Sequence, residues 1–259
     1  TWRNLISVGS NPIAITNCLN FGNPEKDIIM GQFVECIEGI SEACQYLDFP
    51  VVSGNVSFYN ETQNKAISPT PTIGGVGLIK NLENMMTKNF KEIESYILVI
   101  GKTLGHLYQS EFFREVVGIK DGPPPEINLF NEKNNGLIIQ KIISKKLANS
   151  VHDISSGGIL VSLSEMCISG NIGAKIKIPL ENIDANKYLF GEDQSRYLIE
   201  ISRKNKGEVC GILEKNNIYY EIIGKTQEKN LDLNREFSIK IEDLNKLNSS
   251  WFKNYYKEK

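Results

Sequence analysis

The stretch that most constrains this chain is PVVSGNVSFYNE, residues 50–61, where a strand-like run carries a small polar patch at its centre. Valine and aromatic residues favour an extended strand. Alternation along a strand places the polar residues Ser53, Asn55 and Ser57 on one face. It places the apolar residues Val52, Val56 and Phe58 on the other face. We therefore predict a strand over residues 51–59 whose apolar face packs on a core and whose opposite face is polar.

The polar face of this strand suits a polar ligand. Gly54 lies at its centre, and glycine within a strand often marks a point where a ligand approaches the backbone closely. Two hydroxyls and an amide oxygen are groups that bind phosphates and a hard cation such as Mg²⁺. A strand that simply faces solvent would carry the same residue types, and the spacing alone does not decide between the two interpretations.

Hydrophobic periodicity predicts a mixture of helices and strands, which indicates an α+β fold. The clearest helix spans residues 27–47, where apolar residues recur at three- and four-residue steps: Met30, Phe33, Val34, Ile37, Ile40, Cys44 and Leu47. Further helices are expected at residues 1–8, 110–117, 135–146, 208–216 and 241–259, and from about residue 158. Further strands are expected at residues 12–16, 72–79, 96–101, 174–178, 197–202 and 219–224, with a loop at residues 18–24. The charged stretch 82–94 lacks a clear period, so we expect a domain boundary near residue 92 and domains at residues 1–91 and 92–259.

Composition and charge exclude several classes of partner. The 259 residues carry a formal net charge of −2, so no basic field attracts nucleic acid. No run reaches the roughly 20 apolar residues that a membrane-spanning helix needs, and no secretory signal is visible. The five cysteines are scattered without a CxxC pair, which favours reduced, structural thiols and a cytoplasmic location. The chain begins with Thr1 inside an expected helix, which predicts a fragment of a longer polypeptide.

Three further motifs each allow a functional and a structural interpretation. The loop NCLNFGNP, residues 17–24, could hold a nucleotide or serve only as a helix-capping loop. In HDISSGG, residues 152–158, small residues before a helix could bind an anion through backbone N–H groups. Asp153 or Ser155 could equally be a plain N-cap, and His152 a general base or a structural residue. GEDQSR, residues 191–196, could be an edge loop or a functional loop, and its spacing does not decide.

The motifs TNCLNFGNPEK, VVSGNVSFYNET, ISPTPTIGGVGLI, HDISSGGILVSLSE and FGEDQSRYLIEI occur in that order along the chain. Together they resemble the phosphoribosylformylglycinamidine synthase family, in its synthetase component PurL. SGNVSxYNE with TPTIG is specific to that family, whereas HDxSxGG is shared across the aminoimidazole ribonucleotide synthetase-like superfamily. The resemblance covers nearly the whole chain and matches the second of the family's two pseudo-repeated halves. It implies a partial N-type domain at residues 1–91 and a C-type domain at residues 92–259.

The resemblance also implies a reaction and its participants. The family is an ATP-dependent carbon–nitrogen ligase of de novo purine synthesis. It converts formylglycinamide ribonucleotide to formylglycinamidine ribonucleotide with Mg²⁺ and with ammonia from a glutaminase subunit, and a small bridging subunit completes the assembly. The family's catalytic residues belong to the first half, which implies that none lies in this chain and that the chain alone is inactive.

Site residues follow from the same resemblance. It implies that Gly54 binds the nucleotide, that Asn55 ligates Mg²⁺ and that Ser57 contacts the ribonucleotide substrate. It gives position 17 a nucleotide-binding role, although the family usually has Asp there and this chain has Asn17, which keeps an acceptor oxygen but loses the charge. His152 and Asp153 would belong to a second, auxiliary pseudo-site.

Two alternatives remain beside the synthetase interpretation. One is a non-catalytic nucleotide-binding or dimerisation module of the same superfamily. The other is a different superfamily enzyme, such as a thiamine-phosphate kinase or a hydrogenase-maturation factor, which SGNVSFYNE and LNFGNP disfavour. In the full-length family enzyme the sheet of residues 1–91 would pack against the corresponding sheet of the first half. That half is missing here, so we expect the sheet to pair with a second copy of itself in a homodimer.

Overall fold

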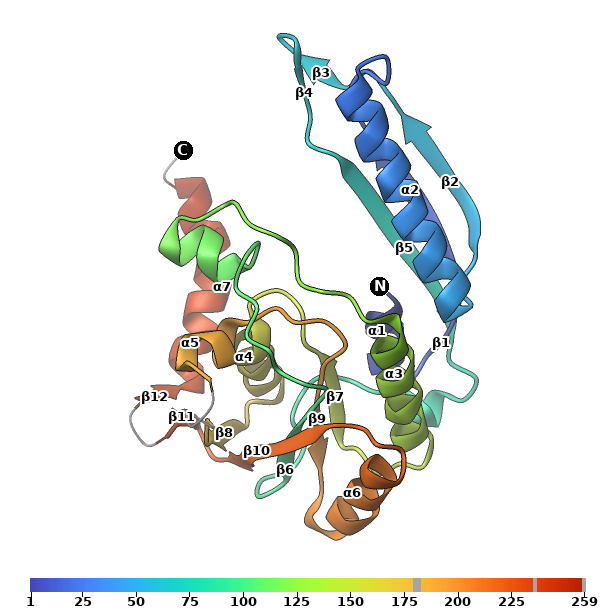
Figure 1. Cartoon of the computed structure of the whole chain (residues 1–259). Helices are drawn as coiled ribbons and strands as arrows, with labels where there is room; N and C mark the ends of the chain where they lie inside the picture. The colour runs from blue at the N-terminus through green and yellow to red at the C-terminus, as the bar shows by residue number, and fades with distance from the viewer. Residues whose placement is uncertain (179–182, 235–236, 258–259) are drawn as a thin grey trace. The chain divides into compact units, whose positions relative to one another are not determined.

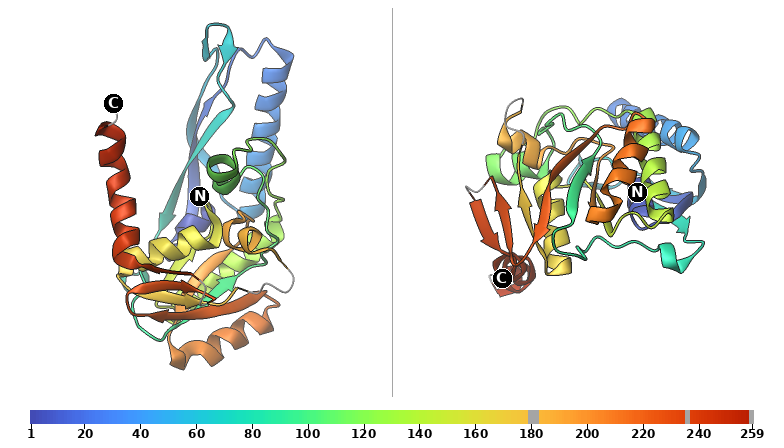
Figure 2. Two further views of the ribbon diagram at one scale, coloured as in Figure 1. Left: turned by 90° about the vertical axis from the view of Figure 1, so that its left-hand side faces the viewer. Right: turned by 90° about the horizontal axis from the view of Figure 1, so that it is seen from below.

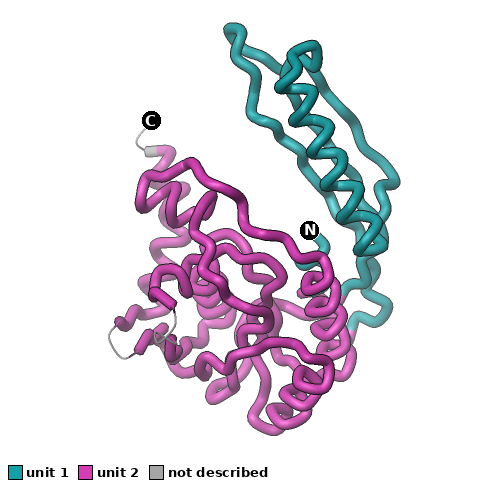
Figure 3. The backbone as a smooth tube through the Cα atoms, viewed as in Figure 1, with its two compact units in different colours: residues 1–6, 10–82 teal, residues 7–9, 83–259 magenta. Residues whose placement is uncertain are grey.

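The computed structural model describes residues 1–178, 183–234 and 237–257 and divides the chain into two compact units (Figure 3). The N-terminal unit comprises residues 1–6 and 10–82, and the C-terminal unit comprises residues 7–9 and 83–259. Residues 91 and 92, near which the sequence analysis placed the boundary, are tied to the C-terminal unit. The buried carboxylate of Glu200 accepts hydrogen bonds from the backbone N–H groups of Lys91 and Glu92, each at 2.9 Å.

The N-terminal unit is a three-stranded sheet with one long helix on it (Figure 1). Its elements are α1 (Trp2–Ser7), β1 (Asn11–Asn20), α2 (Asp27–Leu47), β2 (Val51–Ser57), β3 (Glu61–Thr62), β4 (Lys65–Ala66) and β5 (Thr70–Leu78). The strand order is β2-β1-β5, with β1 parallel to β2 and antiparallel to β5. Because β1 and β2 are parallel, they need the crossover helix α2 between them. The short strands β3 and β4 form a hairpin.

The helix α2 has the bounds that the sequence predicts, but its buried face is a different stripe. Buried Ile29 and the partly buried side chains of Phe33, Cys36 and Ile40 pack on Leu19, Phe21 and Phe58. The predicted core residues Met30, Val34 and Ile37 are 41%, 43% and 37% exposed. They lie about one residue further round the helix, which is a rotation of 100°. The apolar periodicity therefore predicts the helix correctly and only part of its buried face.

The strand β2 also differs from its prediction. It ends at Ser57 instead of Tyr59, and Val52 and Val56 are 68% and 48% exposed instead of buried. The physical reason is that β2 is an edge strand, with β1 as its one neighbour among the described strands, and no side chain of β2 belongs to the described cluster on which α2 packs. Phe58, just beyond the strand, packs against Phe33 with ring centroids 5.0 Å apart, as the sequence predicts for this apolar position.

The C-terminal unit is built on a seven-stranded, mainly antiparallel sheet in the order β12-β11-β8-β10-β6-β9-β7. Its strands are β6 (Tyr96–Ile100), β7 (Ser150–Asp153), β8 (Gly173–Ile176), β9 (Tyr197–Ile201), β10 (Tyr220–Gln227), β11 (Asn230–Leu233) and β12 (Phe237–Lys240). Its helices are α3 (Leu129–Ser144), α4 (Gly158–Gly170), α5 (Ala185–Phe190), α6 (Lys206–Lys215) and α7 (Ile241–Lys257). Shorter helical segments are η1 (Leu82–Asn84), η2 (Phe112–Val117, a π-helix) and η3 (Arg203–Asn205). Among the described strands of this sheet only β8 and β11 pair in parallel, and this mixture of helices with a mainly antiparallel sheet confirms the expected α+β class.

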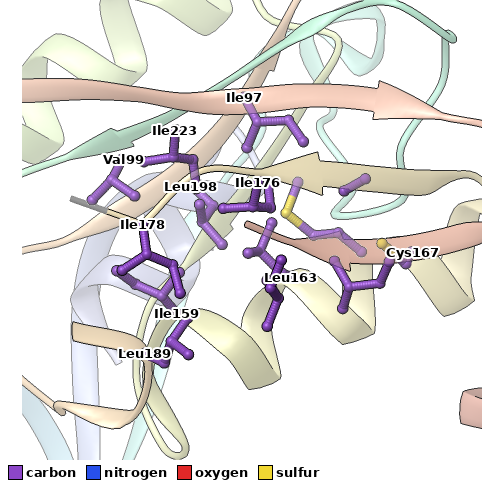
Figure 4. Packing of buried hydrophobic residues seen from close by; sticks show 14 of the residues in the cluster. Ile97, Val99, Ile159, Leu163, Cys167, Ile176, Ile178, Leu189, Leu198 and Ile223 are labelled. Atoms are coloured by element: carbon purple, nitrogen blue, oxygen red, sulfur yellow. The ribbon is translucent and has the colours of Figure 1, made fainter. Parts of the chain in front are cut away.

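The core of this unit lies between α4 and the sheet (Figure 4). Ile159, Leu163 and Cys167 of α4 pack against Ile97 and Val99 of the central strand β6. The residues of β6 that alternate with these, Leu98 and Ile100, are also fully buried. The helix α6 lies on the opposite side of the sheet from α4 (Figure 2, left). The central strands β6 and β9 are therefore buried on both faces, in contrast to the edge strand β2 of the N-terminal unit.

Several element boundaries differ from the sequence prediction. The expected loop at residues 18–24 is wrong at its start, because β1 continues to Asn20. Over residues 15–20 it pairs with both β2 and β5. The helix α3 begins at Leu129, six residues before its predicted start. The helix expected to end at Lys259 is described to Lys257, so that predicted end lies outside the described residues. No helix among the described residues has the length and apolar character to cross a membrane.

Candidate functional site

Two neighbouring strands of the N-terminal unit place their polar residues on one face of the sheet. In the parallel register of β1 and β2, Thr16 lies beside Ser53, Cys18 beside Asn55, and Asn20 beside Ser57. Registered partners point to the same side of a sheet. The predicted residues Asn55 and Ser57 therefore share one face, together with hydroxyl, thiol and amide groups from β1. Asn55 is exposed and Ser57 is half-buried.

A residue that the sequence analysis did not single out holds the end of this polar face. The Asn60 side-chain amide donates to Ser57 Oγ at 3.2 Å, to the Ser57 carbonyl at 3.0 Å and to the Phe21 carbonyl at 2.9 Å. These bonds fix the Ser57 hydroxyl at the point where β2 ends. Asn60 lies within the motif SGNVSFYNE, but its role depends on the turn that returns the chain toward Phe21, which a linear pattern does not show.

Asn17 and Gly54 are also register partners, one residue out of phase with the polar face. Alternation assigns them to the sheet face that carries Leu19, on which α2 packs. A Cβ atom at position 54 would lie 2.0 Å from Asn17 Oδ1 and 2.8 Å from the Asn17 carbonyl oxygen. Glycine is therefore required at position 54 because the Asn17 amide occupies the space of a side chain. The structure brings Asn17 to Gly54 and Asn55 to Ser57, but as two pairs on opposite faces.

The described residues of this face could supply only a small part of the ligand shell of Mg²⁺. Among the described residues, no three His, Cys, Asp or Glu side chains cluster in a way that could hold a metal ion. The Asn55 amide oxygen is a hard ligand of the kind Mg²⁺ accepts, and Mg²⁺ commonly takes most of its remaining ligands from water and phosphate oxygens. Asn55 therefore fits as one protein ligand, and carboxylate ligands would have to come from elsewhere.

The HDISSGG segment forms the end of β7 and the start of α4, as the sequence predicts. The N-cap of α4 is Gly157, in a left-handed conformation, and it has no side chain with which to cap the helix. The suggestion that Asp153 or Ser155 is the N-cap is therefore wrong. Instead, the Gly157 N–H donates to Glu192 Oε1 at 2.8 Å, and the Glu111 N–H donates to the same oxygen at 2.8 Å. An internal carboxylate thus accepts at the helix N-terminus, where the sequence analysis considered an external anion.

His152 lies in a hydrogen-bonded ion network, which favours its structural interpretation. Its Nε2 lies 2.7 Å from Glu165 Oε2, and its Nδ1 lies 3.5 Å from Asp153 Oδ1. Lys88 Nζ reaches the same Glu165 oxygen at 2.9 Å. Burial lowers the pKa of His152, but the hydrogen bonds and charges of Asp153 and Glu165 outweigh it, so the pKa is raised. The bond from His152, with help from Lys88, lowers the pKa of Glu165 to about 2.

The GEDQSR segment, whose role the sequence left undecided, organises the loop after β6. Asp193 Oδ2 accepts from the backbone N–H groups of Leu104 at 3.0 Å and Gly105 at 2.8 Å, and Oδ1 accepts from His106 at 3.1 Å. Arg196 is completely buried, and its guanidinium donates to the carbonyls of Asp193 at 3.0 Å and Gly191 at 2.6 Å. Sequence reasoning missed these roles because each depends on partners distant along the chain.

Family models match both units of the chain. The model "AIR synthase related protein, N-terminal domain" matches residues 1–79, and the model "AIR synthase related protein, C-terminal domain" matches residues 96–233. Among curated relatives, phosphoribosylformylglycinamidine synthase subunit PurL of Pelagibacter ubique is 54% identical over 255 residues. The same subunit of Azorhizobium caulinodans is 45% identical over 254 residues. Each alignment covers 98% of this chain and 35% of the relative, so the chain spans about a third of the length of these proteins.

Solved structures share the fold at low sequence identity. Thermotoga maritima PurL complexed with FGAR superposes with a TM-score of 0.72 at 19% identity, covering 94% of this chain and 41% of that chain. The same protein complexed with ATP gives a TM-score of 0.70 at 18% identity, covering 94% of this chain and 39% of that chain. The hydrogenase maturation protein HypE of Escherichia coli gives 0.68 at 16% identity, covering 91% of this chain and 74% of that chain. At these identities the structural matches establish the fold alone, while the curated relatives confirm the resemblance that the motifs indicate.

Proposed function

The chain belongs to the AIR synthase related protein family, and we propose that it supplies the C-terminal part of the synthetase subunit of a phosphoribosylformylglycinamidine synthase. The observation that carries this proposal is the 54% identity with the PurL subunit of Pelagibacter ubique, which runs through both units of the chain. The two family models, one for each unit, support the same assignment. The chain spans 35% of that relative, which supports the proposal that the activity belongs to a longer polypeptide and not to this part alone.

The proposed reaction uses ATP to activate the amide oxygen of formylglycinamide ribonucleotide, after which ammonia displaces phosphate and gives formylglycinamidine ribonucleotide. A glutaminase subunit supplies the ammonia, and a small bridging subunit completes a cytoplasmic assembly. Binding of ATP and of FGAR by solved relatives of the same fold supports the choice of substrates. Mg²⁺, when bound, would neutralise charge that develops on the transferring phosphoryl group.

Within this chain, each part of the polar strand pair has a proposed role. Asn17 and Gly54, on the opposite face of the sheet from Asn55 and Ser57, contact the nucleotide, and the absence of a side chain on Gly54 leaves the Asn17 amide in place. Asn55 gives one amide ligand to Mg²⁺, and the Ser57 hydroxyl, held by Asn60, contacts the ribonucleotide. Hydrogen bonds of this kind orient the ribonucleotide beside ATP. Holding two reactants in the right geometry contributes much of the rate enhancement in a reaction between them.

A hybrid enzyme tests the proposal. The region of Pelagibacter ubique PurL that aligns with this chain is replaced by residues 1–259, and product formation is measured with formylglycinamide ribonucleotide, ATP, Mg²⁺ and ammonium chloride. We expect the hybrid to retain turnover within about tenfold of the parent, a barrier change of about 1.4 kcal/mol. We expect the 259-residue chain alone to give no turnover, since groups of the other half are needed around the same substrate.

Two outcomes would contradict the proposal. A hybrid that folds, binds ATP and yet gives no product would favour the alternative, a nucleotide-binding or dimerisation module without synthetase activity. Turnover by the 259-residue chain alone, at a rate similar to that of the parent enzyme, would show that this part carries its own catalytic residues.

A further inference from the structure

The C-terminal unit contains a cavity of about 750 Å³ that is separate from the strand residues discussed above. Its walls come from the loop after β6, the first turns of α3 with the residues before it, residues 193–195 and the connection between α6 and β10, with single residues of η2 and α5. None of Asn17, Gly54, Asn55 and Ser57 lines it. The volume lies within the range of about 300–1,000 Å³ that small-molecule sites occupy. The cavity is therefore large enough for a metabolite, and it belongs wholly to one unit.

One side of the cavity is formed by Asp193 and the loop 104–106, and the charge of the Asp193 carboxylate is compensated by its hydrogen-bond donors and by Arg196. The three backbone N–H bonds to Asp193 hold the loop 104–106 against it. The Nη1 atom of buried Arg196 lies 3.8 Å from Asp193 Oδ2, so the guanidinium compensates the charge of the carboxylate. A buried carboxylate with this many donors does not repel an anionic ligand as a free one would. A preformed wall also reduces the ordering cost of binding.

The remaining charges in the wall favour an anion. Lys102 and Lys187 line the cavity, while Glu126 is the only other acidic residue among its described lining residues. The wall thus has one excess positive charge once Asp193 and Arg196 are taken as a pair. The first turns of the 16-residue helix α3 line the same space, and a helix N-terminus adds a partial positive charge. The lysines are exposed and lie beside the cavity, so they are free to close on a phosphate.

Side-chain amides supply neutral hydrogen-bonding groups in the cavity wall, in addition to the charges of Lys102 and Lys187. They are contributed by Asn128, Asn131, Asn134, Asn135, Gln194, Asn216 and Asn217. Asn135 is only 7% exposed, and its Nδ2 donates to the Ser195 carbonyl at 2.8 Å. Amides that both donate and accept match the edges of a nucleobase and the hydroxyls of a ribose.

Aromatic rings with large exposed surfaces complete the lining. Tyr108, Phe130 and Tyr219 are 47%, 64% and 49% exposed, and all three line the cavity together with Phe113. Tyr108 and Phe113 meet edge to face at 5.5 Å. Exposed aromatic faces beside a cavity favour a flat ring that stacks on them and removes them from water. A simple phosphate or sugar phosphate would leave this part of the wall unused.

We propose that this cavity binds a nucleoside monophosphate, with its phosphate near Lys102 and Lys187 and its base among the aromatic residues. Binding at this site depends on the geometry and charge of the C-terminal unit and is independent of the proposed synthetase activity.

Isothermal titration of the 259-residue chain with AMP in EDTA tests the proposal. EDTA removes the Mg²⁺ on which nucleotide binding at Asn55 would depend, so the two sites are measured separately. We expect saturable 1:1 binding of AMP, and at least about tenfold weaker binding of inorganic phosphate and of adenosine, since each fills only part of the wall. Lys102→Glu and Lys187→Glu should each weaken AMP about tenfold or more. Tyr219→Leu should weaken AMP and leave phosphate unchanged.

Control variants separate this site from others. Lys204→Glu makes the same charge change on an exposed lysine outside the cavity, and Asn55→Ala alters the strand site; both should leave AMP affinity unchanged. Circular dichroism confirms that each variant is folded. The proposal is overturned if AMP shows no saturable binding up to about 10 mM. It is also overturned if Asn55→Ala abolishes AMP binding while folded Lys102→Glu and Lys187→Glu variants bind AMP normally.

Discussion

Asn55 and Ser53 are neighbours on the same face of β2. Comparing their alanine variants distinguishes a residue that binds a ligand from one that is merely polar. Both are exposed, and their register partners are Cys18 and Thr16. If Asn55 ligates Mg²⁺, its loss weakens charge neutralisation in the transition state, whereas Ser53 has no assigned ligand.

We therefore expect Asn55→Ala, in the full-length hybrid enzyme, to lower kcat/KM by about 10²-fold, an effect typical of a lost electrostatic group. Ser53→Ala, the matched control, should change kcat/KM less than about threefold. The measurement is steady-state kinetics at several Mg²⁺ concentrations, because a lost metal ligand also raises the Mg²⁺ requirement. Equal effects of the two substitutions would show that the wrong side chain of this face has been assigned to the metal.

Gly54 provides a prediction about stability. Gly54→Ala would place a methyl group 2.0 Å from Asn17 Oδ1, so the amide or the strand has to move. Overpacking of this kind costs about 1–3 kcal/mol. We expect a decrease of that size in the free energy of unfolding, measured by urea denaturation. The matched control is Gly31→Ala on α2, where no atom lies within 4 Å of the added methyl and the change should be neutral or stabilising by up to about 1 kcal/mol.

The double variant Asn17→Ala/Gly54→Ala tests the cause. Removing the Asn17 amide should restore part of the lost stability, although the Asn17 carbonyl oxygen, at 2.8 Å, keeps the recovery incomplete. Additive effects of the two substitutions would show that the cost arises somewhere other than the Asn17 side chain.

At the scale of elements, the contact between β7 and α4 makes the stability of the C-terminal unit depend on pH. The pKa of His152 is raised above its ordinary value of about 6.5, so its contribution is complete below that pH and is lost as the pH rises through the folded-state value. The pKa of Glu165 is lowered to about 2, so its contribution is complete above about pH 4.5 and is lost as the pH falls toward 2. The two windows overlap between about pH 4.5 and 6.5.

We expect His152→Asn to reduce the free energy of unfolding most within that window, by about 1 kcal/mol, because Glu165 is partly exposed and solvent screens the pair. The measurement is urea denaturation of both proteins from pH 3 to pH 9. Glu208→Gln is the control, since it removes the surface pair with Lys145 and involves no histidine. A difference between wild type and His152→Asn that stays constant above pH 8 would contradict the assignment.

Glu192 joins two helical elements through one oxygen, and that arrangement gives a separate prediction. Glu192→Ala leaves the N–H groups of Gly157 and Glu111 without this acceptor. Hydrogen bonds to a charged group contribute about 1.5–3 kcal/mol, so we expect a loss in that range. Glu192→Gln keeps an oxygen acceptor and should lose about half as much. Faster amide hydrogen exchange at Gly157 and Glu111 in the alanine variant would identify the cause, and unchanged exchange there would contradict it.

At the scale of the whole molecule, the sheet of the N-terminal unit has two free edges, β2 and β5. Apolar side chains on these strands are 48–68% exposed: Val52, Val56, Val76 and Leu78. Open strand edges and exposed apolar surface favour pairing with another chain. A second copy of the same sheet can close such a surface by two-fold symmetry. We therefore expect the 259-residue chain to form a homodimer through this unit.

Multi-angle light scattering over about a hundredfold range of concentration measures the association, since a dimer with Kd near the micromolar range changes mass over such a range. Val76→Lys should shift the equilibrium toward monomer. Val116→Lys, at a residue 71% exposed on η2 in the other unit, should leave it unchanged. A mass that stays monomeric at the highest concentration would rule out this pairing.

The sequence by itself determined the features that depend on local periodicity and on residue type. The bounds of α2, the common face of Asn55 and Ser57 and the α+β class follow from spacing along short segments. The family follows from the resemblance of five ordered motifs to known proteins. Spacing also predicted the position of most strands of the C-terminal unit, including the central strand β6. These patterns are readable because the period of a helix or a strand is fixed by backbone geometry, whatever the rest of the chain does.

Only the tertiary structure decided which faces are covered and which distant residues meet. The exposure of Val52 follows from the edge position of β2, and the buried stripe of α2 follows from how the helix lies on its sheet. Glu192 meets Gly157 across 35 residues of sequence, and Asp193 meets Leu104 across 89. The 750 Å³ cavity is lined by segments that lie far apart along the chain, from Gly101 to Tyr219. Contacts of this kind are set by the packing of elements against one another, and that packing leaves no fixed spacing along the chain from which it could be predicted.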